Sequence, residues 1–159
     1  MLMSILYRSH AILGRESRAE RSMLNTVRTL NRAAKITGHL HREEDVYYQW
    51  IEGPVAAVEA LLIRLQRDPR HADFSLLGRQ ITTHRQFADW SMGYSTSNEG
   101  DLLEWAIRNG SSLKVTDPAQ MVAFFHDQAL RNEIRERPAL YRHLRDAGSD
   151  TATAIDHQQ

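Results

Sequence analysis

The run from Val46 to Pro54 constrains this chain most, because one amide side chain stands there among aromatic and aliphatic residues. Apolar, aromatic and β-branched residues dominate the run, and Gly53-Pro54 ends it, which predicts a short β-strand. Gln49 does not fit, since a buried amide without a hydrogen-bonding partner costs about 1–3 kcal/mol. Gln49 therefore lies either at a wet sheet edge or against a partner that supplies donors and acceptors.

Periodicity divides the first 95 residues into five strands and two helices. Strands are predicted at 4–9, 35–41, 46–53, 74–83 and 89–94, and the charged segment 42–45 is predicted to be the turn of a hairpin. One helix is predicted from Ser17, where Ser17 and Glu20 have the spacing of a capping box, to Ala34, and a second follows Pro54. The order predicts an α+β, ferredoxin-like βαββαββ sandwich, a five-stranded mixed sheet with two helices on one face.

The chain after residue 95 changes to a helical pattern, which predicts a C-terminal extension. Helices are expected at 101–109, from Asp117 onward and at 138–147, while 148–159 is polar and expected to be disordered. The predicted division is 1–95 for the sandwich, 96–147 for the extension and 148–159 for the tail. Two helices on one face leave the sheet's back apolar, and Phe124 and Phe125 are expected to dock the extension there.

Composition excludes several classes of function. The 159 residues suffice for one domain with a real core, and twenty basic residues balance twenty acidic ones. This balance argues against a nucleic acid or an anionic membrane surface as partner. The absence of cysteine excludes disulfides and thiolate sites. No segment approaches the roughly 20 apolar residues of a membrane span, and no signal peptide is evident, so a cytoplasmic protein is expected.

Three polar residues are predicted to face one another beneath the helices. Strands one and three of a split βαβ unit are neighbours, which places Tyr7 beside Gln49. Asn31 falls on the inward face of the first helix, four residues beyond Val27. Such a slot suits a flat heterocycle with imide-like edges. The alternative is that each of the three is an ordinary core or edge group with a local partner.

These residues occur in a pattern that resembles BLUF domains, the blue-light sensors that use FAD. The resemblance covers about residues 3–95 and rests on motifs in their order and spacing. The motifs are Tyr7, Asn31 before Ile36-Thr37-Gly38, the segment 48–53, Asp68-Pro69-Arg70-His71 and Trp90-Ser91-Met92-Gly93. The helical tail resembles that of short members without a fused output enzyme.

The resemblance assigns cofactor contacts to six residues. It implies that Tyr7 is the photochemical tyrosine, Gln49 the switching glutamine and Asn31 the side chain that holds the flavin's O4 and N3 edge. Asp68, Arg70 and His71 match an element that contacts the flavin ring and ribityl region. Rotation or tautomerisation of Gln49 would reverse its hydrogen bonds, and a new bond to flavin O4 would give a red-shifted state.

The resemblance also implies a route for the signal. Trp90 and Met92 match a pair near the flavin that relays the change, and Ser9 matches a serine that can pair with the tryptophan. Departures from the family pattern are Leu30, where a polar residue is usual, and His39 and His41, where apolar residues are usual. No third imidazole or matching carboxylate is evident beside the two histidines, so no metal is expected.

The aromatic neighbours of Gln49 leave two possibilities open. Tyr47, Tyr48 and Trp50 are either competing electron donors or sheet packing. The whole pattern predicts a non-enzymatic, FAD-binding photoreceptor, a homodimer or higher homo-oligomer, that signals to a downstream effector protein. The alternative is a small ferredoxin-like enzyme of the dimeric monooxygenase type, with Tyr7 and Asn31 among the residues of a substrate pocket.

Overall fold

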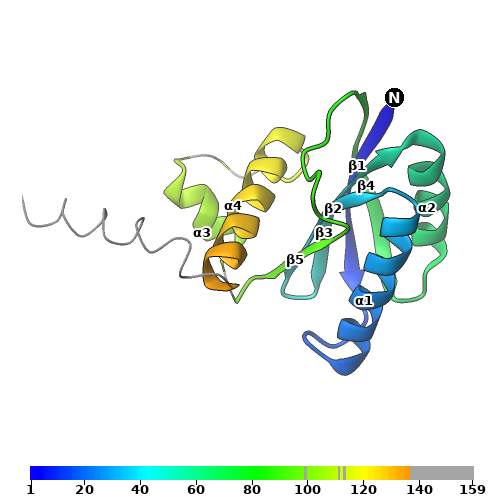
Figure 1. The fold of residues 1–159 in the computed structure, drawn as a ribbon. Coiled ribbons are helices and arrows are strands. Elements are labelled where there is room, and N and C mark those ends of the chain that lie inside the picture. Colours follow the sequence, from blue (N-terminus) through cyan, green and yellow to red (C-terminus); the bar gives the residue numbers. More distant parts are fainter. Residues whose placement is uncertain (99, 111, 113, 137–159) are drawn as a thin grey trace, which may run out of the picture.

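The computed structural model describes residues 1–98, 100–110, 112 and 114–136 (Figure 1). The elements are β1 (Leu2–Ala11), α1 (Arg18–Ala33), β2 (Thr37–Glu43), β3 (Val46–Pro54), α2 (Val55–Arg67), β4 (His71–Thr82), β5 (Gly93–Thr96), α3 (Leu102–Arg108) and α4 (Pro118–Glu136). The helix predicted at 138–147 and the tail 148–159 lie outside the described residues. Within the described part, no helix is long and apolar enough to cross a membrane.

The five strands form one sheet in the order β4-β1-β3-β2-β5. The β1 strand is antiparallel to both β3 and β4, β2 is antiparallel to β3, and β5 runs parallel to β2. This confirms the predicted α+β, ferredoxin-like fold with a mixed sheet. The register places Tyr7 directly opposite Gln49. Directly opposed residues project from the same face, so these two side chains share one side of the sheet.

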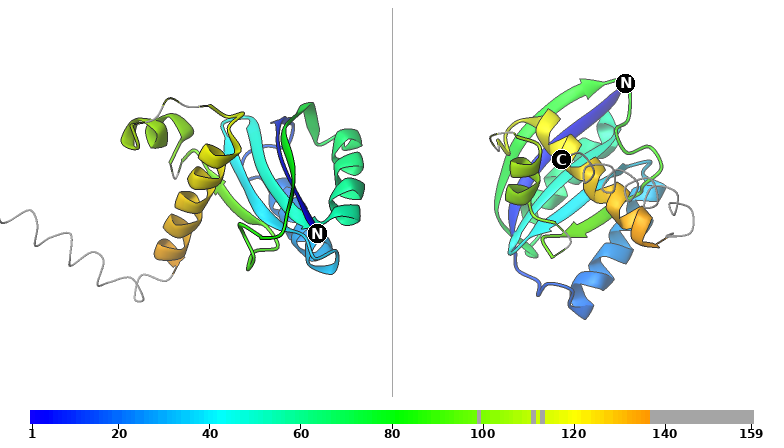
Figure 2. Two further views of the ribbon diagram at one scale, coloured as in Figure 1. Left: turned by 90° about the horizontal axis from the view of Figure 1, so that it is seen from above. Right: turned by 90° about the vertical axis from the view of Figure 1, so that its left-hand side faces the viewer.

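Helices cover both faces of this sheet (Figure 2). The α2 helix packs on β1 and β3, with Val58 and Leu62 buried in the contact. On the opposite face, Phe124 and Phe125 of α4 are fully buried in a cluster that includes Trp50. Complete burial of a phenylalanine side chain contributes roughly 1.5–3 kcal/mol. The α4 helix is therefore a structural part of the core on the back of the sheet.

The α1 helix begins where the sequence predicts a capping box, but only half of that box forms. The Ser17 hydroxyl accepts a hydrogen bond from the Glu20 N–H at 3.1 Å, as an N-cap does. The Glu20 carboxylate accepts from the Glu16 N–H at 2.9 Å instead of from the Ser17 N–H. Its Oε2 accepts from the side chains of Arg42 and Tyr47 in the interior. Glu20 thus ties the start of α1 to β2 and β3.

Several predicted boundaries are shifted, and two of the shifts change which residues are buried or lie in a strand. The segment 42–45 is not a turn throughout, because β2 continues to Glu43 and Arg42 is 1% exposed. The fifth strand spans 93–96 instead of 89–94, so Trp90 and Met92 lie in the loop before it. The cause is a turn, in which the Trp90 N–H bonds to the Phe87 carbonyl at 3.3 Å.

Two histidines of β2 belong to a hydrogen-bonded chain on the α4 side. His39 Nε2 and His41 Nδ1 each lie 2.8 Å from the Ser95 hydroxyl, and His41 Nε2 lies 2.7 Å from the Glu43 carboxylate. A carboxylate only accepts, so His41 donates through Nε2 to Glu43; when His41 Nδ1 accepts from Ser95, the Ser95 hydroxyl in turn accepts from His39. His39 Nδ1 is then a buried acceptor, and no partner for it is found among the described residues.

The sequence does not predict a carboxylate beside these two histidines. In the structure Glu43 lies there and accepts a hydrogen bond from His41. Burial, followed by the charges of His41 and His126, lowers the pKa of His39 to about 3. In the described part of the chain, no group of three or more His, Cys, Asp or Glu side chains is arranged to hold a metal ion. Both histidines bond to Ser95, and their rings pack against Phe125 and Phe124 of α4.

Candidate functional site

A cavity of about 140 Å³ lies between the sheet and the helices α1 and α2. Its apolar walls are formed by Met23, Leu24, Val27, Leu30, Leu40, Ile51, Leu61 and Leu65. Its polar lining consists of Tyr7, Asn31, Gln49, Arg64, Asp68, Arg70 and His71. The fold therefore brings together all six residues that the family resemblance assigns to the cofactor, although they come from four separate segments of the sequence.

Tyr7 and Gln49 are joined directly by their side chains. The Tyr7 hydroxyl donates to Gln49 Oε1 in a short, buried hydrogen bond. Burial, with smaller contributions from Tyr47 and Asp68, raises the pKa of Tyr7 far above its ordinary value. The phenol is therefore neutral and keeps its proton on the bond to Gln49. Gln49 is 5% exposed and has Tyr7 as a partner, so it does not lie at a solvent-exposed edge of the sheet.

The other end of the Gln49 amide contacts the loop before β5. Gln49 Nε2 donates to the sulfur of Met92 at 3.0 Å, and Met92 is buried. Asn31 Nδ2 donates to the Ser91 carbonyl at 2.9 Å, so a second amide of the cavity holds the same loop. Asn31 uses one N–H there, so its second N–H and its side-chain oxygen remain as a donor and an acceptor for a ligand.

The charged end of the cavity is organised by one ion pair. The Arg70 guanidinium contacts the Asp68 carboxylate through two nitrogens, at 2.9 Å and 2.6 Å. These hydrogen bonds hold the pKa of Asp68 below its usual value, so the carboxylate stays ionised. Burial lowers the pKa of His71, whose Nδ1 lies 2.8 Å from the Ser9 hydroxyl. His71 begins β4, three residues before the start predicted for this strand.

The Ser9 hydroxyl pairs with His71 in this structure, whereas the resemblance implies a serine that can pair with Trp90. The Trp90 ring lies 6.1 Å from that of His39 and packs with the α4 cluster, whereas Ser9 and His71 lie on the cavity side. Met92 is therefore the member of the relay pair that contacts the switching glutamine in this structure.

The aromatic neighbours of Gln49 divide between the two faces. Tyr48 and Trp50 pack into the cluster on the α4 side, so the sheet separates them from the cavity. Tyr47 lies on the cavity side, with its ring 5.5 Å from that of His71, and donates to Glu20. Two of the three possible competing donors are thus ordinary sheet packing.

The residues of the cavity fit a flavin chemically. Apolar walls suit the faces of a ring system, and the Asn31 and Gln49 amides suit its polar edge. Arg64, which the sequence reading did not single out, adds a cation beside Arg70 for a phosphate group.

The comparisons with known proteins agree with this chemistry. A model of the family described as "Sensors of blue-light using FAD" matches residues 2–93, more than half of the chain. The photoactivated adenylate cyclase subunit beta of Euglena gracilis is 25% identical over 111 residues. That match covers 65% of this chain and 13% of the Euglena protein, so the chain spans a small part of that relative's length.

Solved structures resemble the chain over most of its length. The dark-state structure of the BLUF protein BlrB has a TM-score of 0.67 and 28% identity, and the match covers 77% of this chain and 92% of that one. The ground state of BlsA has a TM-score of 0.63 and 25% identity, with 80% and 86% covered. These findings do not favour the monooxygenase-type alternative. The chain belongs to the BLUF family of blue-light sensors, whose cofactor is FAD.

Proposed function

We propose that this chain is a short photoreceptor in which Gln49 is the moving part and the loop before β5 carries the signal. The observation that supports it is the double contact of one amide, which accepts from Tyr7 and donates to Met92. When bound, the flavin supplies blue-light absorption and an excited-state electron acceptor. Tyr7 would be the oxidisable group beside it, and the Tyr7 proton would move along the hydrogen bond to Gln49 Oε1.

Reorientation of Gln49 has a direct mechanical consequence. In the present arrangement its N–H group faces the Met92 sulfur and its oxygen faces the Tyr7 hydroxyl. A thioether sulfur can accept a hydrogen bond but cannot donate one. If the amide reverses, its oxygen meets a group that offers no proton, and the Gln49–Met92 contact is lost. The switch is therefore a change of hydrogen bonding that releases Met92 without a covalent step.

Output through a separate protein is part of the proposal. The chain covers 32% of a bacterial light-regulated adenylyl cyclase that it resembles with a TM-score of 0.60 and 25% identity. That match covers the minor part of the relative, so the cyclase activity of that protein is not carried over to this chain. The division at residue 95, assembly into a homodimer or larger homo-oligomer, and a cytoplasmic location stay predictions.

The experiment is to purify the full chain, load it with FAD and record its absorption in darkness and under blue light. The proposal predicts a yellow protein whose flavin band shifts to the red and recovers in darkness. A protein that takes up no flavin on reconstitution, or whose bound flavin shows no reversible shift, would reject it.

A further inference from the structure

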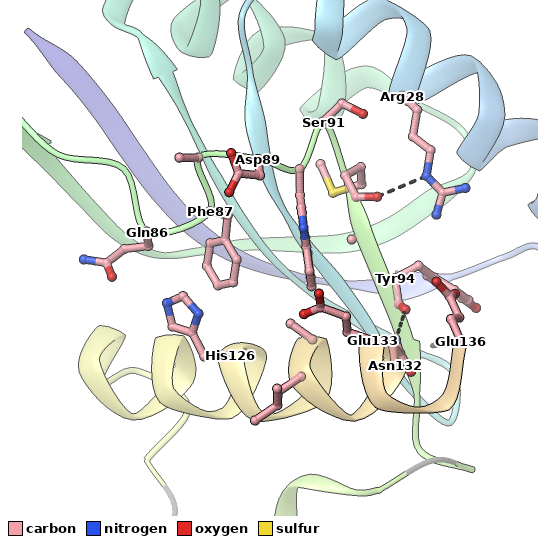
Figure 3. Close-up of a pocket in the computed structure, with 16 residues that line it drawn as sticks. Arg28, Gln86, Phe87, Asp89, Ser91, Tyr94, His126, Asn132, Glu133 and Glu136 are labelled. Atoms are coloured by element: carbon pink, nitrogen blue, oxygen red, sulfur yellow. Dashed lines mark hydrogen bonds between the residues drawn. The ribbon is translucent and has the colours of Figure 1, made fainter. Parts of the chain in front are cut away.

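The edge of β5 lies in a second, larger hollow that the photochemistry does not use. This groove, of about 720 Å³, runs between α4, the segment 86–94 and Arg28 of α1 (Figure 3). Its volume falls within the roughly 300–1,000 Å³ of ligand-binding sites. The β5 strand has β2 as its single neighbour in the sheet, so its other edge faces this groove.

The direction of the backbone groups follows from the strand pairing. The Ser97 N–H bonds to the Arg42 carbonyl of β2 at 2.9 Å. Alternate residues of a strand point their N–H and C=O groups to opposite sides, so the groups of Ser95 also face β2. Those of Tyr94 and Thr96 therefore face away from β2. An edge of this kind is a template for a further strand.

Two side chains cap this edge, one from each wall. Arg28 Nε donates to the Met92 carbonyl at 3.0 Å, and Asn132 Nδ2 donates to the Tyr94 carbonyl at 2.8 Å. Figure 3 shows both bonds, which reach the strand from α1 and α4. Side chains that satisfy edge carbonyls prevent unwanted strand pairing and can be displaced by a strand that offers its own N–H groups.

The lining of the groove selects for charge and shape. Asp89 and Glu133 line it and form no ion pair with any other described residue, and Arg28 is the one guanidinium in the lining. Trp90 is half-buried and Leu130 is 48% exposed, so apolar surface is available beside the carboxylates. An incoming strand with basic and β-branched side chains complements both features.

We propose that the β5 edge is the docking site for an extended, basic segment of a partner protein, which adds a strand beside Tyr94. Arg28 and Asn132 hold the edge closed in the dark. The link to light rests on the proposed function, because Met92 carries both the Gln49 contact and the Arg28 contact. Release of Met92 breaks the bond to Arg28 and frees the edge.

The probe is a fluorescent hexapeptide, Val-Lys-Val-Arg-Val-Thr, titrated against the full, FAD-loaded chain and followed by anisotropy. In the dark, Arg28→Ala and Asn132→Ala should each bind it at least tenfold more tightly than the wild type. Arg32→Ala is the matched control, since Arg32 is an exposed arginine of the same helix outside the groove. Wild-type protein under blue light should bind as Arg28→Ala does.

Two altered peptides test the mode of binding. N-methylation of alternate backbone amides removes strand pairing and keeps the charge, while glutamate in place of lysine and arginine keeps the backbone and reverses the charge. Both should lose binding, and Asp89→Asn with Glu133→Gln should weaken it severalfold. Equal binding of the N-methylated peptide, or no binding to either opened variant, would overturn the proposal.

The remaining possible occupant of the β5 edge is a second copy of this chain. Analytical ultracentrifugation of Arg28→Ala tests for it by measuring whether the variant dimerises. A variant that dimerises through this edge and ignores the peptide would replace the partner strand by a second copy and overturn the proposal. The dark arm needs no photochemistry. Peptide binding to Arg28→Ala without any effect of light on the wild type would reject the light coupling and leave the docking site standing, so the two failures are distinguishable.

Discussion

Gln49 donates to the sulfur of Met92 across 3.0 Å, and this contact joins the cavity to the loop before β5. The same loop is held by Asn31, through the Ser91 carbonyl, and by Arg28, through the Met92 carbonyl. Gln49, Asn31 and Arg28 thus hold the loop at Ser91 and Met92, and Gln49 and Asn31 also line the cavity. This short loop therefore gives a change inside the cavity a hydrogen-bonded route to β5.

Replacement of Met92 by alanine should uncouple this loop while leaving the cofactor in place. The Gln49 amide loses its sulfur partner but keeps its bond to Tyr7, so the absorption spectrum should change only modestly. Hydrogen exchange of the 90–96 amides should differ between light and dark in the wild type and not in Met92→Ala. Met23→Ala is the control, because Met23 lines the cavity without contacting Gln49 by a hydrogen bond. Light-dependent exchange that survives in Met92→Ala would contradict the relay.

Tyr7→Phe should bind FAD and lose the reversible red shift, because it removes the oxidisable phenol and the proton that Gln49 accepts. The ring stays in place, stacked 4.8 Å from Phe74, so folding should be preserved. Absorption spectra before and after blue light check this directly. Tyr48→Phe serves as the control on the far side of the sheet and should retain the shift.

Replacement of the buried Glu20 by alanine should lower the free energy of unfolding strongly. Its carboxylate accepts from Arg42, Tyr47 and Tyr94, and removal of one member of a buried ion pair typically costs about 3–5 kcal/mol. Urea unfolding of Glu20→Ala should show a loss of this order. Glu59→Ala, which breaks an exposed pair with Arg79, should cost about 0–1 kcal/mol. Equal losses in the two variants would show that the network contributes no special stability.

His39 should make the fold sensitive to acid. Its folded pKa of about 3 lies below the ordinary value of 6.5, so the unfolded chain takes up a proton that the folded chain refuses between these values. The contribution of His39 to stability is therefore complete above pH 6.5 and falls by about 1.4 kcal/mol per pH unit as the pH drops through this window. His39→Leu should remove that slope from the difference between wild type and variant. A slope that is unchanged in the variant would show that His39 is protonated in the folded chain.

The sequence predicts those parts of the site that depend on local pattern and common topology. The split βαβ rule places Tyr7 beside Gln49, and helical periodicity places Asn31 on the inward face, so the core of the cavity is foreseeable. The family resemblance assigns Asp68 and Arg70 to the cofactor, and both residues line the same cavity. The placement of Tyr7 opposite Gln49 is set by strand register, which the hydrophobic pattern of the two strands specifies.

Long-range polar partners were not foreseeable in the same way. Arg42 was expected in a solvated turn because charged residues usually are, but the buried Glu20 pairs with it from 22 positions earlier in the chain. Ser9 was expected near Trp90 and pairs with His71 instead. Such choices depend on which side chains the finished fold brings within about 3 Å of one another, and no periodic pattern encodes that.

The loop before β5 was misread for a related reason. Trp90 and Met92 look like strand residues, yet their segment turns at Phe87 and sends the two side chains to opposite faces. The sequence also does not predict the hydrogen bonds from Arg28 and Asn132 to the β5 edge, because these residues lie on helices far apart in the chain. Both features depend on contacts that only the finished fold makes.

The most direct test of the account is the light-minus-dark absorption spectrum of Gln49→Ala compared with the wild type, both loaded with FAD. The wild type should show a reversible red shift of the flavin band. Gln49→Ala should bind FAD and show none, because the amide that bridges Tyr7 and Met92 is gone. A normal reversible red shift in Gln49→Ala would contradict the claim that this side chain is the switch.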